Sequence, residues 1–313
     1  MAVNSLENVI LHVGLAKTST TYFQKCVWPK LKTYTHLTRP FTVHNHAFNQ
    51  LQYADDSLYD KELVVDELNK ISGKNLMISD SFLTGQPVGF SYINRSLIAK
   101  RLKEIFPQAK ILLFLRDQKD ILLSYYSSYV KMLYGTKKFK DFIWKPAEDY
   151  TFADFKRQPH RYDPRTLYFN SNDFYLHLDC FKYSALINCF RKYFEDMHVF
   201  LYEDFEHNSS DVLRRIAKIV GEKIDVKAEN KVNVSLSSRD LEKVRKANIL
   251  STYTKGRKVK RIAQWGMRLL PGSNRDLRED ASDIVGDYYQ EDNRLLRNIL
   301  PHLPWSCCPG KYN

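Results

Sequence analysis

The chain has 313 residues, of which 43% are hydrophobic and 13% aromatic, and it carries a formal net charge of +12 at pH 7. This length can bury a substantial core, as one large α/β domain or as two small ones. No apolar run approaches the ~20 residues that span a bilayer, and no basic region opens the N-terminus. We therefore expect no membrane span, no secretory signal and a cytoplasmic protein.

The cysteines and the charge narrow the class of protein further. The five cysteines are odd in number and lack the paired spacing of metal ligands, which predicts reduced structural thiols and no bound metal. The positive charge is concentrated between Arg239 and Arg278, where 12 lysines and arginines stand against three acids. Such a stretch fits a solvated helix face, a polyanion-binding surface or a membrane-facing one. No nucleic-acid-binding motif accompanies it, so we expect no nucleic-acid partner.

The first predicted element is a strand over Val9–Val13, which leads through Gly14 into a helix start rich in hydroxyls. Lys17 is followed by Thr18, Ser19, Thr20 and Thr21. A strand that turns into a helix in this way directs free backbone N–H groups and a helix dipole at one point, which favours a phosphate or sulfate. Ordinary capping at a βα junction is the alternative, although it needs fewer than four hydroxyls. Ala16 stands where a nucleotide-triphosphate loop has glycine, so this is not a standard loop of that kind.

The later elements alternate strand and helix patterns, which predicts a parallel sheet covered by helices. Further strands are predicted over Leu76–Ser79, Lys110–Leu115 and His198–Tyr202. Helices are predicted over Thr20–Lys32, Asn94–Phe106, Gln118–Tyr134, Lys182–Phe194, Ser209–Val220 and Ser238–Leu250. Asp211 and Gly221 are the predicted caps of the helix over Ser209–Val220.

Two of these strands end in polar residues that add to the first site. Arg116 follows the strand over Lys110–Leu115, and Ser124 comes eight residues later, just over two helical turns on. Asp80 follows the strand over Leu76–Ser79. Ligands of open parallel sheets collect beyond the carboxyl ends of the strands, so we expect Lys17, Arg116 and Asp80 around one crevice. Pairing of Arg116 with a nearby aspartate at the helix start is the alternative for that residue.

These motifs resemble those of the PAPS-dependent sulfotransferases, in particular the bacterial and carbohydrate members. Lys17 to Thr21 resembles the family's 5′-phosphosulfate loop, which usually reads Lys-Thr/Ser-Gly-Thr/Ser-Thr/Ser. Arg116-Asp117 with Ser124 resembles its 3′-phosphate motif. Two departures are Ser19 in place of the usual glycine and Gln118 in place of the common proline.

Later segments extend the resemblance to about Leu300, with the middle of the chain unaligned. Tyr202-Glu203-Asp204-Phe205 is similar to a segment after a late strand in these members, and Tyr288-Tyr289 with Asn293 is similar to their closing helix. Lys255-Gly256-Arg257 resembles a loop that closes over the 3′-phosphate, but about thirty residues separate it from that helix, more than the family pattern leads us to expect.

The resemblance implies a single P-loop-like α/β domain over 1–313, with helices on both faces of a central parallel sheet. It also implies in-line transfer of a sulfuryl group from PAPS to an acceptor hydroxyl, without a metal, leaving adenosine 3′,5′-bisphosphate (PAP). Lys17 would stabilise the leaving oxygen. The residues implied to bind the donor are Gly14, Leu15, Ala16, Lys17, Thr18, Ser19, Thr20, Thr21, Arg116, Ser124, Lys255, Gly256 and Arg257.

An acceptor hydroxyl needs a general base, and Asp80 lies where many carbohydrate sulfotransferases place theirs. The alternative for Asp80 is an N-cap or turn aspartate. His44 and His46, in a loop after the first helix, are the next candidates. We expect structural roles for His12, inside the first strand, and for Glu203.

The acceptor is predicted only as a class. The stretch 135–180 is an irregular insertion rich in aromatic and basic residues, which suits a carbohydrate or glycolipid. Within the basic helical segment 239–278, residues 255–270 read as a nucleotide lid, a helix packed on the sheet or a peripheral membrane contact. Two rival functions are an ATP-dependent small-molecule kinase and a non-catalytic polyanion binder.

Overall fold

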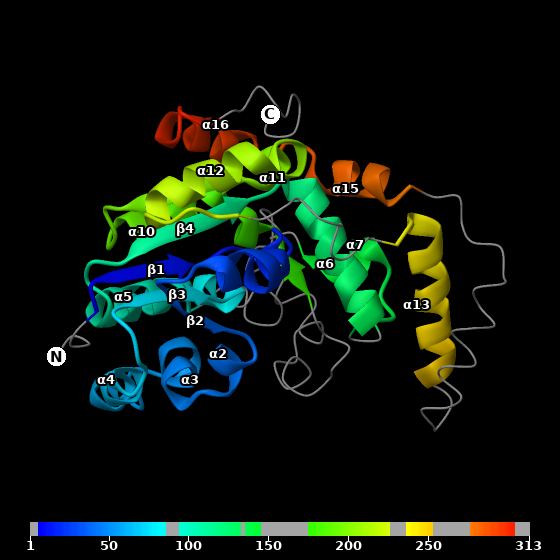
Figure 1. Ribbon diagram of the computed structural model, residues 1–313. Helices are drawn as coiled ribbons and strands as arrows, with labels where there is room; N and C mark the ends of the chain where they lie inside the picture. Colours follow the sequence, from blue (N-terminus) through cyan, green and yellow to red (C-terminus); the bar gives the residue numbers. More distant parts are fainter. Residues whose placement is uncertain are drawn as a thin grey trace, which may run out of the picture.

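The computed structural model describes residues 6–85, 94–132, 135–144, 175–225, 236–252 and 276–303. At its centre is a parallel five-stranded sheet with the strand order β2-β3-β1-β4-β7, which confirms the predicted fold class (Figure 1). The strands are β1 (Asn8–His12), β2 (Thr35–Thr38), β3 (Asn75–Ser79), β4 (Lys110–Leu115) and β7 (Met197–Leu201).

Each central strand is apolar on both sides because both faces of the sheet are buried. Leu11, Ile78 and Leu113 lie in the larger of two core clusters. Their neighbours along the strands, Met77 and Leu112, lie in the smaller cluster. Successive side chains of a strand point to opposite faces, so the two clusters are the two sides of one sheet.

Helices cover both of these faces. The larger cluster takes apolar residues from α3 (His46–Tyr53), α4 (Lys61–Asn69), α5 (Arg95–Ile105), α6 (Gln118–Met132), α7 (Phe139–Phe142), α10 (Tyr183–Arg191), α13 (Ser238–Thr252), α15 (Leu277–Val285) and α16 (Gln290–Ile299). The smaller cluster is covered by the helical segment that follows the first loop and by α12 (Ser209–Val220). Two short helices, α2 (Phe41–His44) and α11 (Tyr202–His207), follow the ends of β2 and β7.

The helix predicted over Thr20–Lys32 is not a single α-helix. The segment consists of α1 (Thr20–Tyr22), a π-helical turn (Phe23–Val27) and a 3-10 turn (Trp28–Lys30). Pro29 explains the change near the end, because proline has no N–H to donate to the preceding turn and its ring crowds that turn's carbonyl.

The structure corrects one predicted cap and adds one strand. The N-cap of α12 is Asn208, whose side chain accepts a hydrogen bond from the N–H of Asp211, so Asp211 lies inside the first turn. Gly221, with φ of 73°, ends this helix as predicted. The sequence pattern does not reveal β2, because Thr35–Thr38 holds a single aliphatic residue and lies at the sheet edge.

The predicted insertion 135–180 is described only at its ends. These ends pair as a small parallel ladder, with Ile143 of β5 (Ile143–Trp144) opposite Leu176 of β6 (Leu176–His177). Residues 145–174 lie outside the described residues, as does the predicted segment 255–270. Within the part of the chain that the structure describes, no helix is both long enough and apolar enough to span a membrane.

Candidate active site

The carboxyl edge of the sheet carries a charged or aromatic residue at the end of almost every strand. Arg39, Asp80, Arg116 and Tyr202 each come directly after the last residue of β2, β3, β4 and β7, and the first loop follows β1. His12 at the end of β1 is level with Ser79 and with Leu112, so β4 continues through Leu113 to Leu115 beyond it. At ~3.3 Å per residue, β4 rises about 10 Å above the end of β1. The loop after β1 therefore lies against a step in the sheet edge.

This loop turns sharply because two of its residues adopt left-handed backbone conformations. Lys17 has φ of 74° and Ser19 has φ of 62°, on either side of Thr18. Such conformations are unfavourable for residues other than glycine and are concentrated at functional sites. They curl the chain so that successive N–H groups can converge on one anion.

Most N–H groups of this loop have no partner among the described residues. Outside the turn Leu15–Thr18, no backbone N–H from Gly14 to Thr21 donates a hydrogen bond to a described residue, although Gly14, Leu15 and Thr20 are buried. Buried backbone donors are almost always satisfied in native proteins, by protein groups, water or a ligand. A row of such donors at a helix start is the arrangement that binds phosphate and sulfate.

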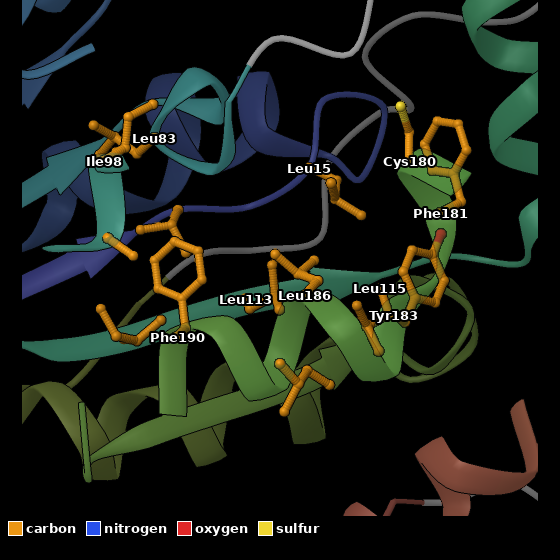
Figure 2. Packing of buried hydrophobic residues seen from close by; sticks show 14 of the residues in the cluster. Leu15, Leu83, Ile98, Leu113, Leu115, Cys180, Phe181, Tyr183, Leu186 and Phe190 are labelled. Atoms are coloured by element: carbon orange, nitrogen blue, oxygen red, sulfur yellow. The ribbon is translucent and has the colours of Figure 1, made fainter. Parts of the chain in front are cut away.

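Side chains inside the loop maintain its shape. The hydroxyls of Thr18 and Thr20 donate to the carbonyl of Leu15, at 2.6 and 3.3 Å. While they do so they cannot donate to an anion, which leaves that contact to the backbone, Lys17 and the exposed Thr21. Leu15 itself reaches from the loop into the larger core cluster (Figure 2). At Gly14 a Cβ would lie 3.0 Å from Nε2 of His12, so a larger residue there would crowd that ring.

Arg116 joins the loop to the next strand. Its Nη1 donates to the carbonyl of Lys17 at 2.8 Å, and its guanidinium lies 4.4 Å above the ring of Tyr202. A hydrogen bond from Ser19 reaches the hydroxyl of Tyr202, where it opposes the burial that raises the pKa of that tyrosine. Nε of Arg116 is buried and has no partner in the described residues. Nη2 also forms no hydrogen bond with a described residue, which leaves the outer end of this guanidinium for an anion beside the loop.

Three cations gather at this point. Burial lowers the pKa of Lys17, and repulsion from Lys131 and Arg116 lowers it further. Lys131 lies seven residues after Ser124 on α6, which places both on the same side of the helix. None of the three cations forms an ion pair with a carboxylate among the described residues. A bound anion would offset their mutual repulsion.

A buried network holds Arg116 and the start of α6 in place. The N–H of Asp117 donates to Glu203 at 2.9 Å, and the hydroxyl of Tyr183 donates to the carbonyl of Arg116 at 2.6 Å. Asp292 of α16 accepts from the N–H of Tyr183 at 2.7 Å. Glu203 therefore has the structural role expected for it.

Two departures from the usual motifs also find partners in the structure. Gln118, which stands where proline is common, donates to Asn293 of the closing helix at 2.7 Å. Ser19, where glycine is usual, contacts Tyr202 as described above.

Asp80 is buried and fully engaged. Its Oδ1 accepts from the N–H of Phe82 at 2.9 Å and from Nε of Arg39 at 3.1 Å, while Oδ2 accepts from the hydroxyl of Thr42 at 2.6 Å. It is the N-cap of the 3-10 turn Ser81–Thr84, which is the alternative role that the sequence leaves open.

The three histidines considered in the sequence differ in burial. His12 is fully buried, accepts from the indole N–H of Trp28 at 3.3 Å and lies 2.8 Å from the hydroxyl of Ser79; burial lowers its pKa to about 3, so the ring is neutral. His44 in α2 and His46 at the start of α3 are both exposed. Lys255, Gly256 and Arg257 lie outside the described residues.

The structure places three residues near the site that the sequence analysis does not identify: Arg39, Lys131 and Tyr183. Arg39 follows a strand with no clear sequence pattern, and the partner of Tyr183 is set by tertiary packing, so neither could be predicted. Lys131 could have been predicted, since it follows Ser124 at a spacing of two helical turns.

Comparison with known proteins identifies the fold. No model of a protein family matches the chain, and no curated protein sequence does. The sulfotransferase from Alicyclobacillus acidocaldarius is similar with a TM-score of 0.53 and 14% identity, over 96% of this chain and 98% of that one. The mouse sulfotransferase SULT7A1 complexed with PAP gives a TM-score of 0.40 at 14% identity, over 96% and 92% of the two chains. A sulfotransferase domain from the curacin biosynthetic pathway gives 0.36 at 11% identity, over 90% and 98%.

The first of these similarities shows that the chain has the sulfotransferase fold. It confirms the fold expected from the resemblance of the loop and of the Arg116 motif.

The left-handed conformation of Ser19 predicts an order of stability among its variants. Ser19→Gly relieves about 1 kcal/mol of backbone strain, which offsets the lost hydrogen bond, so it should be at least as stable as the parent. Ser19→Ala keeps the strain and loses the hydrogen bond, and should be about 1 kcal/mol less stable. Urea unfolding of the three proteins measures the order. A glycine variant less stable than the alanine variant would contradict the prediction.

Asp117 predicts a pH-dependent contribution to stability. Burial raises the pKa of this carboxyl to about 6, with further increases from Asp120 and Glu203. The folded protein therefore holds a proton that the unfolded chain releases, and the contribution is full below pH ~4 and is lost as the pH rises through about 6. Asp117→Asn removes this titration and can still accept the N–H of Asp120.

The free energy of unfolding of Asp117→Asn, relative to that of the parent, should therefore be higher at pH 8 than at pH 4.5. The difference should be at most about 3 kcal/mol. Urea unfolding at the two pH values measures the difference, with the exposed Asp287→Asn as the control. An equal effect of Asp117→Asn at both pH values would show that the carboxyl is not perturbed.

Proposed function

We propose that the protein is an enzyme that transfers a sulfuryl group from PAPS to an acceptor hydroxyl. The observation that supports this most is the pair of adjacent anion sites: the loop from Gly14 to Thr21 with its unpaired N–H groups, and Arg116, whose Nη2 has no partner among the described residues. PAPS carries one anionic group at its 5′ end and another at its 3′ end. A donor of this kind would satisfy both sites together, and the sulfotransferase fold agrees with the assignment.

The residues divide the work of binding the donor. The backbone of the loop from Gly14 would hold the 5′-phosphosulfate, with Thr18 and Thr20 keeping the loop curled through Leu15. Arg116 and the half-buried Ser124 would hold the 3′-phosphate. The roles assigned to Lys255, Gly256 and Arg257 rest on the sequence alone.

Lys17 would stabilise the transition state. Sulfuryl transfer resembles phosphoryl transfer in its demands, which are alignment of donor and acceptor and neutralisation of charge on the leaving oxygen. The Lys17 ammonium is partly buried beside two other cations, so it acts where little solvent screens its charge.

Asp80 is the base that we propose, on the grounds that it follows β3, the strand next to β1. Its three hydrogen bonds mean that it would have to exchange one of them for the acceptor hydroxyl. The ion pair with Arg39 also weighs against a kinase, in which Asp80 would hold Mg²⁺.

A carbohydrate or glycolipid remains the acceptor class that we propose. A cytoplasmic location and a peripheral membrane contact through 255–270 are proposals from the sequence, because that segment lies outside the described residues.

The donor assignment predicts selective stabilisation by PAP. At about 100 times its Kd, PAP should raise Tm by about 4 °C, whereas AMP, ATP with Mg²⁺ and an oligonucleotide should not. Lys17→Ala and Ser124→Ala should each reduce the rise, because each removes a group assigned to one end of the donor. Lys25→Ala, an exposed lysine on the same helical segment, is the matched control. Stabilisation by ATP or by the oligonucleotide in place of PAP would reject the assignment.

The base assignment predicts a separation of activity from stability. With radiolabelled PAPS and an acceptor found in a glycan screen, Asp80→Asn should lower kcat by about 10²- to 10⁴-fold while the Tm rise with PAP persists. Thr42→Val removes one hydrogen bond to the Asp80 carboxylate but leaves the carboxylate itself in place. It therefore serves as the control for the loss of a structural contact. If both variants lose activity only in proportion to their loss of folded protein, Asp80 is a capping residue and not the base.

A further inference from the structure

An open pocket of about 610 Å³ lies beyond the carboxyl end of β2. It is lined by His36, Thr38, Arg39, Pro40, Phe41, His44 and Asn45. None of the donor residues proposed above lines it, and its lining includes no acidic residue. This pocket, which we call the acceptor pocket, is therefore separate from the donor residues, and Arg39 is the cationic side chain that lines it.

The acceptor pocket lies on the side of the loop from which an acceptor would have to approach. In-line transfer requires the acceptor on the side of the sulfuryl group opposite the leaving phosphate. Arg116, the proposed 3′-phosphate residue, lies on the β4 side of the loop, and β3 and then β2 lie on the other side. Strands are about 4.8 Å apart, so the pocket begins roughly 10 Å from the loop, across the end of β3.

The guanidinium of Arg39 is held in a position from which it can bind an anion in the pocket. Its Nε is bonded to Asp80, and its guanidinium lies 3.9 Å above the ring of Phe82. These contacts fix the side chain, which is 36% exposed, while its two terminal nitrogens form no hydrogen bond with the described residues. A fixed guanidinium with free terminal nitrogens is suited to a carboxylate, which it can bind through two parallel hydrogen bonds.

An exposed aromatic ring completes the pocket. The ring of Phe41 is 40% exposed, and nearby Tyr53 is 49% exposed and feels the charges of both Asp80 and Arg39. Exposed aromatic rings beside hydrogen-bonding groups are a suitable surface for the apolar face of a sugar ring.

We propose that the acceptor pocket binds a sugar that carries a carboxylate, with the carboxylate on Arg39 and the ring face on Phe41. The acceptor class is then an acidic glycan or glycoside that contains a uronic acid. This inference rests on the proposed function, in that it takes the occupant of the pocket to be the acceptor.

Two probes that differ only in the carboxylate test the proposal: nitrophenyl glucuronide and nitrophenyl glucoside. Their affinities for the full chain are measured by saturation-transfer NMR, with and without PAP. The glucuronide should bind at least about tenfold more tightly, the gain expected from a charge-assisted contact. Equal affinity for the two probes, or no binding of either, would overturn the proposal.

Variants of the pocket test whether Arg39 causes the preference for the glucuronide. Arg39→Gln should abolish this preference, and Arg39→Lys should retain part of it, because lysine keeps the charge but not the paired geometry. Phe41→Ala should weaken both probes alike and leave their ratio unchanged. If the preference survives in Arg39→Gln, the carboxylate binds elsewhere and the proposal for this pocket is rejected. If Arg39→Gln fails to fold because it leaves Asp80 unpaired, then Arg39→Lys with an undiminished preference would reject it equally.

The donor and acceptor assignments fail separately in this design. Absence of PAP binding with the glucuronide preference intact would reject the donor and support the pocket. PAP binding without any preference would reject the pocket and leave the donor assignment standing.

Discussion

The hydrogen bond from Arg116 to the carbonyl of Lys17 is the constraint on which the site depends. Lys17 and Ser19 adopt left-handed conformations, and most N–H groups around them have no partners within the described residues. Left alone, such a loop would relax toward ordinary backbone angles. It is held from two directions, by Leu15 in the core and by a guanidinium at the top of the neighbouring strand. The step between β1 and β4 makes this possible, because it brings Arg116 to the height of the loop.

The same contact connects the site to the end of the chain. Arg116 is fixed by Tyr183, and Tyr183 begins a helix whose first N–H is bound by Asp292. Gln118 and Asn293 form a second connection between the same two regions, across 175 positions of sequence. The closing helix α16 therefore belongs to the scaffold of the anion site. Replacement of Asp292 should therefore weaken the support of Arg116, because the lost hydrogen bonds leave buried polar groups unsatisfied.

Much of this could be predicted from the sequence because the decisive residues lie at ends of apolar strands. β4 has the predicted bounds, and Arg116 and the loop follow their strands directly, so the parallel sheet alone brings them together. Other features depend on tertiary packing. β2 holds little apolar signal, so Arg39 and its pairing with Asp80 could not be anticipated. The donation of Thr18 and Thr20 to Leu15 follows from backbone angles that sequence patterns do not specify.

On the proposed assignment, the strand order separates the residues of the donor from those of the acceptor. β1, β4 and β7 supply the loop, Arg116 and Tyr202, whereas β3 and β2 supply Asp80 and Arg39. The ion pair between Asp80 and Arg39 lies wholly in the second group, and the contact of Arg116 with Tyr202 lies wholly in the first. Changes on the β2 side can therefore alter which acceptor enters without disturbing the strained loop. On this proposal the fold can keep one donor while its acceptor pocket varies, because the pocket lies at the end of β2, which β3 separates from β1 and the loop.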